Sequence, residues 1–82
     1  MNEQSSRAAV LDSLHQVAPE VDLEALEPDA ELRDELDLDS MDFLSFLEAL
    51  HRLTGVDVPE RDYPKLLTVA SCVDYVDQRR SG

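Results

Sequence analysis

Apolar residues recur at helical spacing in three separate stretches of the chain. The first stretch predicts a helix over residues 5–18, which begins near Gln4 to Ser6 with a serine as N-cap and stops before Pro19. Its apolar stripe consists of Val10, Leu11, Leu14 and Val17.

The second stretch predicts a helix over residues 40–53 with one apolar face. At 100° per residue from Phe43, four further apolar residues fall within about 80° and complete the core face. They are Phe46, Leu47, Leu50 and Leu53. Met41 lies about 160° away and Leu44 about 100° away, so both are expected toward the rim or outside.

The ends of this second helix carry residues typical of caps. Asp39 is suited to be the N-cap, and Asp42 follows three residues later as a short version of the capping box. Gly55, which comes directly after Thr54, is the expected C-terminal stop.

The remaining segments complete an all-α fold. Twenty residues without a sustained period precede Ser40, and we expect an ordered long first loop with a short turn near Asp29 to Asp34. Its apolar anchors are Val21, Leu23, Leu26, Leu32, Leu36 and Leu38. Pro59 and Pro64 bracket a short helix over 60–63, and Thr68 caps a last helix over 68–79. The last apolar stripe consists of Val69, Cys72, Val73 and Val76.

No strand pattern occurs, so the sequence predicts a single domain, 1–82, built as a small all-α bundle of three main helices plus one short helix.

Negative charge is concentrated in the middle of the chain. The formal net charge is −12, and residues 20–48 hold 12 acidic residues and a single base, Arg33. Repulsion disfavours nucleic acid and anionic membranes as partners, whereas a partner with a basic surface is favoured. A solvated surface that promotes solubility is nevertheless the commoner explanation of such a run.

Catalytic and metal-binding patterns are not found. The two glycines form no phosphate loop, and neither His15 nor His51 has the partners of a catalytic site. A calcium loop counted from Asp37 would place Met41 at position 5 and Asp42 where glycine is needed, so we reject an EF-hand. We therefore predict no catalytic residue and no metal.

Cys72 is the only cysteine, which excludes an intramolecular disulfide and suits a small, partly buried helix residue. No apolar run is long enough for a signal peptide or a membrane span. The expected compartment is the cytoplasm, and a monomer is expected.

Ser40 stands out among the carboxylates. A serine at a helix start is usually only a cap. Here Asp39 can serve as the cap, so the Ser40 hydroxyl is expected to face solvent at the first helical position. The N–H groups and positive dipole of a helix start suit an attached phosphate, and Met41 and Leu44 lie close by. The pattern favours a surface serine that is modified and docked against.

The stretch ELRDELDLDSMDFLSFLEAL resembles the phosphopantetheine attachment site of acyl carrier proteins. The resemblance extends over nearly the whole chain, with LEPDAEL in the long loop, TGVDVPERD after the second helix and LTVASCVDYV at the last helix. It implies that Ser40 receives 4′-phosphopantetheine from coenzyme A through a separate, Mg²⁺-dependent phosphopantetheinyl transferase. Acyl groups would then be carried as thioesters on this arm, and the protein itself would not be an enzyme.

The resemblance also implies partner enzymes with basic docking surfaces that transfer or modify acyl groups in fatty acid, lipid or secondary-metabolite biosynthesis. The residues that match docking positions are Asp39, Met41, Asp42, Leu44 and Glu48.

Several positions depart from the family pattern. Asp37 stands where glycine is typical, although aspartate tolerates a left-handed backbone. Positions that are often acidic in the family are Ser45, His51 and Arg52 here, which indicates partners other than the enzymes of housekeeping fatty acid synthesis. We hypothesise that Phe43, together with Phe46, reduces the space for a long acyl chain.

Two other functions fit the residues. The first is a peptidyl or aminoacyl carrier. The second is an acidic helical interaction module that carries nothing and in which Ser40 is merely structural.

Overall fold

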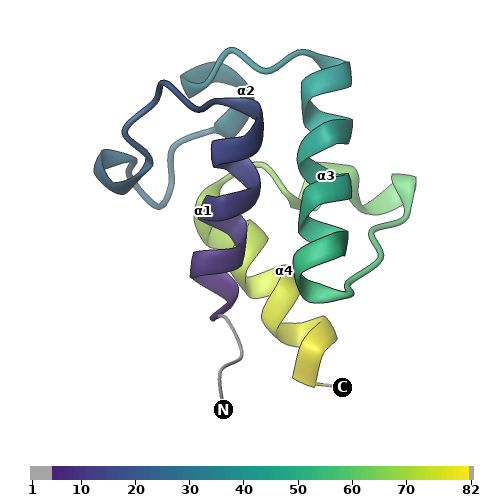
Figure 1. The fold of residues 1–82 in the computed structure, drawn as a ribbon. Coiled ribbons are helices and arrows are strands. Elements are labelled where there is room, and N and C mark those ends of the chain that lie inside the picture. Colours follow the sequence, from purple (N-terminus) through teal and green to yellow (C-terminus); the bar gives the residue numbers. More distant parts are fainter. Residues whose placement is uncertain (1–4, 82) are drawn as a thin grey trace.

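The computed structural model describes residues 5–81. Its elements in chain order are α1 (Ser6–Val17), the 3₁₀ helix η1 (Leu23–Ala25), α2 (Leu32–Glu35), α3 (Ser40–Thr54), the 3₁₀ helix η2 (Glu60–Lys65) and α4 (Val69–Ser81). Figure 1 shows α1 and α3 side by side in opposite directions, with α4 crossing behind α1. Within residues 5–81 the only β feature is a single bridge between Glu31 and Thr68. The predicted all-α bundle is confirmed.

The first helix is capped by a serine, as expected. The side chain of Ser5 accepts a hydrogen bond from the backbone N–H of Ala8 at 3.1 Å. Gln4, the other expected start, lies outside the described residues. The helix ends at Val17, where the Ala18 N–H still bonds the Leu14 carbonyl at 2.8 Å. Pro19 follows directly and cannot continue the ladder, because proline has no N–H.

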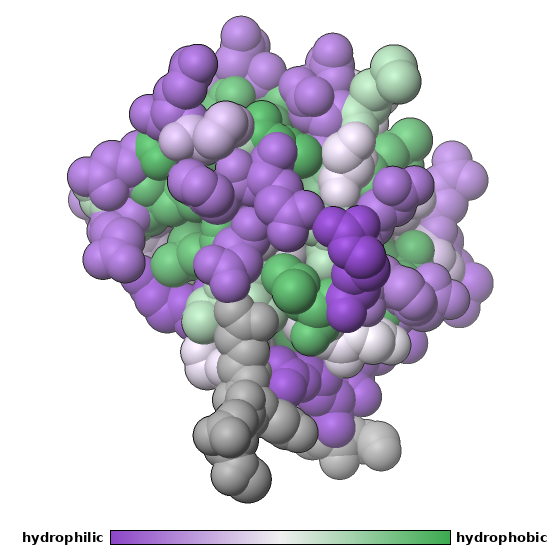
Figure 2. Space-filling model, in the orientation of Figure 1, coloured by the Kyte–Doolittle hydropathy of each residue, from purple (hydrophilic) through white to green (hydrophobic). Residues whose placement is uncertain are grey.

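The three apolar stripes meet in one core. Its most completely buried large side chains are Val10, Leu14, Leu32, Phe46, Leu50, Leu66 and Val76. The prediction for Leu53 was wrong: it is 38% exposed, while Ala49 is buried. A helical-wheel angle gives the direction of a side chain around the axis but not its position along it, and Leu53 lies in the last turn of α3. The surface in Figure 2 is mostly polar, with small apolar areas between polar groups.

The long connection between α1 and α3 is ordered and is joined to the start of α4. The predicted anchors Leu23, Leu32, Leu36 and Leu38 are buried, and Val21 and Leu26 pack partly buried against the core. The backbone N–H of Leu32 donates to the Leu67 carbonyl at 2.8 Å, and the N–H of Ala70 donates to the Pro28 carbonyl at 2.9 Å. The expected turn near Asp29 to Asp34 is realised as turn residues followed by α2.

The short helix after α3 is longer than predicted. We expected it to stop at residue 63, before Pro64, but η2 runs to Lys65 with Pro64 inside it. A proline fits here because its fixed φ is close to that of a 3₁₀ helix and its missing N–H removes only one bond. The backbone N–H of Leu66 still closes the turn on the Tyr63 carbonyl at 3.0 Å.

Thr68 caps α4 as predicted, with a reciprocal pair of bonds. The Ser71 N–H donates to Thr68 Oγ1 at 3.0 Å, and the Thr68 N–H donates to Ser71 Oγ at 3.0 Å. The helix continues to Ser81, two residues beyond the predicted end. Asp62 of η2 is buried against α4, where it accepts hydrogen bonds from Tyr75 Oη at 2.6 Å and Arg79 Nη2 at 3.0 Å. This pair of bonds holds η2, one wall of the site described below, against the bundle.

Candidate functional site

Ser40 is the first residue of α3, and the cap is made by its neighbour. Asp39 has an extended backbone, and its Oδ1 accepts a hydrogen bond from the backbone N–H of Asp42 at 2.8 Å. This bond satisfies one of the free donors of the helix start, so the Ser40 side chain is not needed as a cap. Ser40 is exposed. Asp39 is confirmed as the N-cap, and Ser40 is confirmed as an exposed residue at the first helical position.

A tight turn ahead of Ser40 aims the chain into α3. Asp37 has φ 54°, the only positive φ of a non-glycine residue in the described part of the chain. The Leu38 N–H donates to the Arg33 carbonyl at 3.1 Å, and the Leu36 N–H donates to the Leu32 carbonyl at 3.0 Å. This is a Schellman ending of α2 with aspartate in the position that glycine usually holds. The expected left-handed Asp37 is confirmed.

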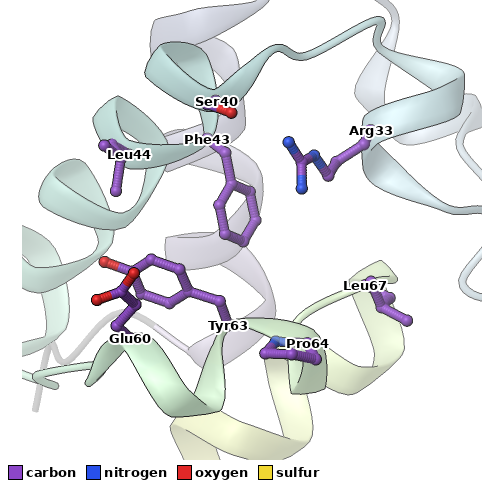
Figure 3. Close-up of a pocket in the computed structure, with 8 residues that line it drawn as sticks. All are labelled: Arg33, Ser40, Phe43, Leu44, Glu60, Tyr63, Pro64 and Leu67. Atoms are coloured by element: carbon purple, nitrogen blue, oxygen red, sulfur yellow. The ribbon is translucent and has the colours of Figure 1, made fainter.

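A groove of about 590 Å³ opens beside Ser40, between the start of α3 and η2 (Figure 3). We refer to it as the Ser40 groove; its lining consists of Arg33, Ser40, Phe43, Leu44, Glu60, Tyr63, Pro64 and Leu67. Apart from Ser40 and the two charged residues, these side chains are apolar or aromatic. The groove can therefore hold a largely apolar group that starts at the Ser40 hydroxyl.

Phe43 forms the inner wall of the Ser40 groove. Its ring meets Tyr63 edge-on with 5.6 Å between centroids, and it lies 6.0 Å from the ring of the buried Phe46. The Arg33 guanidinium lies 5.5 Å from the Phe43 centroid. Because these rings fill the space between the groove and the core, the space open beside Ser40 lies at the surface.

Three predicted site residues lie in a row on α3. Ser40, Leu44 and Glu48 are spaced four apart and are all exposed, so they share one line along the helix. Met41, 77% exposed, lies beside this line, whereas Asp42 is partly buried and further around the helix. The structure therefore brings most of the predicted docking residues to one surface, with Asp42 at its edge.

A second groove of about 460 Å³ begins on the other side of Leu44. We refer to it as the His51 groove; its lining is Leu44, Leu47, Glu48, His51, Arg52, Asp57, Val58 and Tyr63. His51 Nδ1 lies 3.1 Å from the Val56 carbonyl, and Arg52 donates to Gln16 Oε1 of α1 at 2.8 Å. Leu44 and Tyr63 line both grooves, so they form the ridge between them.

Cys72 is not a site residue. It is completely buried, more so than the sequence predicted, and burial raises the pKa of its thiol to about 12. Since the thiolate is the reactive form, this cysteine is inert while the protein is folded.

Sequence reasoning missed five groove residues: Arg33, Glu60, Tyr63, Pro64 and Leu67. The isolation of Arg33 among 12 acidic residues was a signal that could have been followed. The other four give no local signal, because they reach the groove through the packing of η2 and the chain after it.

Neither a cluster of metal-binding side chains nor a membrane-spanning helix occurs in residues 5–81. No group of three or more His, Cys, Asp or Glu side chains there is placed to hold a metal ion. No helix in that range is both long enough and apolar enough to cross a membrane.

Comparisons with known proteins give the class of protein to which this all-α fold belongs. Residues 8–76 match the family described as "Phosphopantetheine attachment site". The acyl carrier protein of Rubrobacter xylanophilus is 27% identical over 79 residues, which cover 93% of this chain and 98% of the relative. That of Campylobacter curvus is 30% identical over 73 residues, 85% of this chain and 95% of the relative. That of Thermosynechococcus vestitus is 32% identical over 59 residues, 72% and 73% respectively.

The chain therefore belongs to the phosphopantetheine-attachment family of acyl carrier proteins. It is a carrier and not an enzyme, and its family implies a covalently bound 4′-phosphopantetheine. This family membership argues against the alternative of an acidic helical interaction module that carries nothing.

Proposed function

We propose that Ser40 is the residue to which 4′-phosphopantetheine is attached, and that the protein presents acyl intermediates to partner enzymes. The observation that carries this proposal is the cap: Asp39 occupies the N-cap position, which leaves the exposed Ser40 hydroxyl beside a groove. When bound, the prosthetic group supplies a terminal thiol on which acyl groups are held as thioesters.

The residues of the chain support this role without any catalytic chemistry. The start of α3 offers free backbone N–H groups and positive dipole to a phosphate on Ser40. The apolar walls formed by Phe43, Tyr63 and Leu67 accept the less polar part of an attached group. Cys72 cannot compete as the thioester thiol, because it is buried inside the bundle.

Partner enzymes would dock on the row of Ser40, Leu44 and Glu48, with Met41 beside it. Met41 and the 45% exposed Leu44 offer apolar contact next to the attachment point. Asp39 and Glu48 offer negative charge to a basic surface and act mainly on the encounter rate. One turn beyond Glu48, α3 carries His51 and Arg52 and no acid, so partners that need acids there would be disfavoured.

An acyl cargo is favoured over a peptidyl or aminoacyl cargo, because the relatives compared above are named acyl carrier proteins. The pathway is one of fatty acid, lipid or secondary-metabolite biosynthesis in this proposal.

The test is incubation with coenzyme A, Mg²⁺ and a broad-specificity phosphopantetheinyl transferase, followed by intact mass measurement. We expect the wild type and Ser45→Ala to gain the mass of one phosphopantetheine group, and Ser40→Ala to gain nothing. Ser45 is the matched control, since it is a second exposed serine of α3, between one and two turns beyond Ser40. Equal gain in Ser40→Ala, or none in the wild type, would contradict the assignment.

A further inference from the structure

Arg33 occupies an unusual place for the only base in an acidic segment. Residues 20–48 contain 12 acidic residues and no other Lys or Arg. Even so, Arg33 forms no ion pair with a carboxylate among residues 5–81. Its guanidinium instead lies in the Ser40 groove, against the ring of Phe43 (Figure 3).

The backbone holds Arg33 in this position. Its carbonyl accepts the Schellman bond from the Leu38 N–H, and the preceding residue, Leu32, is bonded to Leu67 across the bundle. The guanidinium lies over the Phe43 ring in a cation–π contact, with 5.5 Å between its central carbon and the ring centroid. This contact uses the charge of the group and leaves its N–H donors available. Those N–H groups donate no hydrogen bond to an acceptor within the described chain.

Other charges near Ser40 are negative. Asp37 and Asp39 precede the serine, Asp42 follows it, and Glu60 also lines the groove. In Figure 3, Glu60 lies on the other side of Phe43 from Arg33. An anion attached to Ser40 is repelled by these carboxylates, and Arg33 is the cation of the groove that can offset the repulsion.

We propose that Arg33 binds the phosphodiester of the arm carried by Ser40. This inference rests on the proposed attachment at Ser40. The phosphodiester is bonded to the serine oxygen, so it is always held at the edge of the groove at high effective concentration. A guanidinium matches phosphate oxygens with paired N–H donors. The contact lays the first part of the arm along Phe43 and toward Leu67.

The competing role for Arg33 is only to cover the Phe43 ring. That role predicts no response of the guanidinium when the arm is attached. The two roles are distinguished by NMR on the apo form and on the pantetheinylated form, using the Arg Nε–Hε signals and the ³¹P signal. The variants are Arg33→Gln, which removes the charge, and Arg33→Lys, which keeps the charge but loses the paired donors.

Arg7→Gln is the matched control, because Arg7 is exposed on α1 and lines a different groove with Ser5 and Ala8. Both Gln variants change the net charge equally, and circular dichroism checks that each is folded. We expect pantetheinylation to shift the Arg33 Nε–Hε signal and not that of Arg7. We also expect Arg33→Gln to shift the ³¹P signal, Arg33→Lys to shift it less, and Arg7→Gln to leave it unchanged.

The proposal would be overturned if the Arg33 Nε–Hε signal were the same in the apo and the fully pantetheinylated protein and the ³¹P signal were the same in the wild type and Arg33→Gln. Arg33 would then only cover the Phe43 ring. A response seen only after a carboxylate-bearing acyl group is loaded would overturn it as well, because the anion would then belong to the cargo. A wild type that gains no mass would instead refute attachment at Ser40, and this proposal with it.

Discussion

The carboxylate of Asp39 accepts the backbone N–H of Asp42 at 2.8 Å, and this bond closes the first turn of α3 around Ser40. The other half of the expected capping box, a bond from the Asp39 N–H to the Asp42 side chain, is not seen in the described residues. Asp42 takes part in the cap only through its backbone N–H. The serine is thereby at the helix start without being its cap.

Two replacements of Asp39 distinguish its contribution as the N-cap from the contribution of its negative charge. Asp39→Ala should lower the free energy of unfolding by about 1 kcal/mol, because the donor of Asp42 loses its partner. Asp39→Asn should keep most of that stability but slow association with a basic partner, more so at low salt. Chemical denaturation and transferase kinetics measure the two effects. Equal stability of the Ala variant and the wild type would show that the cap contributes nothing.

Asp37 is expected to be a strained position. Asp37→Gly should raise the free energy of unfolding by up to about 1 kcal/mol, because glycine adopts φ 54° without a steric cost. Asp37→Asn removes the same charge and keeps a side chain that tolerates this backbone. If Asp37→Asn raised the free energy of unfolding as much as Asp37→Gly, the effect would be assigned to charge repulsion and not to backbone strain.

Two leucines on α3 should differ sharply in their cost of removal. Leu50→Ala should destabilise the protein by about 2–5 kcal/mol, because Leu50 is completely buried. Leu53→Ala should cost less than about 1 kcal/mol, because that side chain is exposed at the end of the helix. Denaturant midpoints compare the pair. Similar losses would show that Leu53 belongs to the core after all.

The two thiols of the loaded protein should differ in reactivity. In the folded apo form Cys72 should not react with a maleimide at neutral pH, because it is buried and its pKa is about 12. After pantetheinylation the thiol of the arm should react, which gives one label per chain. The same single label is expected in Cys72→Ala, which lacks the buried thiol. Mass spectrometry counts the labels, and denaturant exposes Cys72 as a positive control. Rapid labelling of the folded apo protein would contradict this picture.

Asp62 should make the stability sensitive to acid. The hydrogen bond from Tyr75, followed by the charges of Lys65 and Arg79, lowers the pKa of this carboxyl. A lowered folded pKa means that its contribution is complete above the ordinary Asp pKa of about 3.9 and is lost as the pH falls through the folded value. Tyr75→Phe removes the main cause, so its loss of stability below about pH 4 should be smaller than that of the wild type. Thermal melts across this range measure the difference, and identical pH profiles would exclude Asp62 as the group responsible.

Tyr75 should act at the opposite end of the pH scale. Burial and the bond to Asp62 raise the pKa of its hydroxyl, so this contribution is complete below about pH 10 and is lost at higher pH. Tyr75→Phe lacks this hydroxyl, so above about pH 10 its free energy of unfolding should depend less on pH than that of the wild type.

Local interactions made much of the fold predictable. A serine near the start of α1, Asp39 and Thr68 were recognisable as caps and Gly55 as a stop, because capping joins residues only a few positions apart. The exposure of Met41 and Leu44 followed from helical periodicity alone. The left-handed Asp37 was equally a local matter, since so few residue types tolerate that backbone.

The sequence by itself thus determined where α1, α3 and α4 begin and that Ser40 faces solvent, because both depend on contacts within one or two turns. Only the tertiary structure decided what surrounds Ser40. The bond between Leu32 and Leu67 joins segments far apart in the chain and carries Arg33 to the groove, and the burial of Asp62 brings η2 and Tyr63 opposite it. Such placements depend on how separate elements pack against each other, which no local pattern encodes.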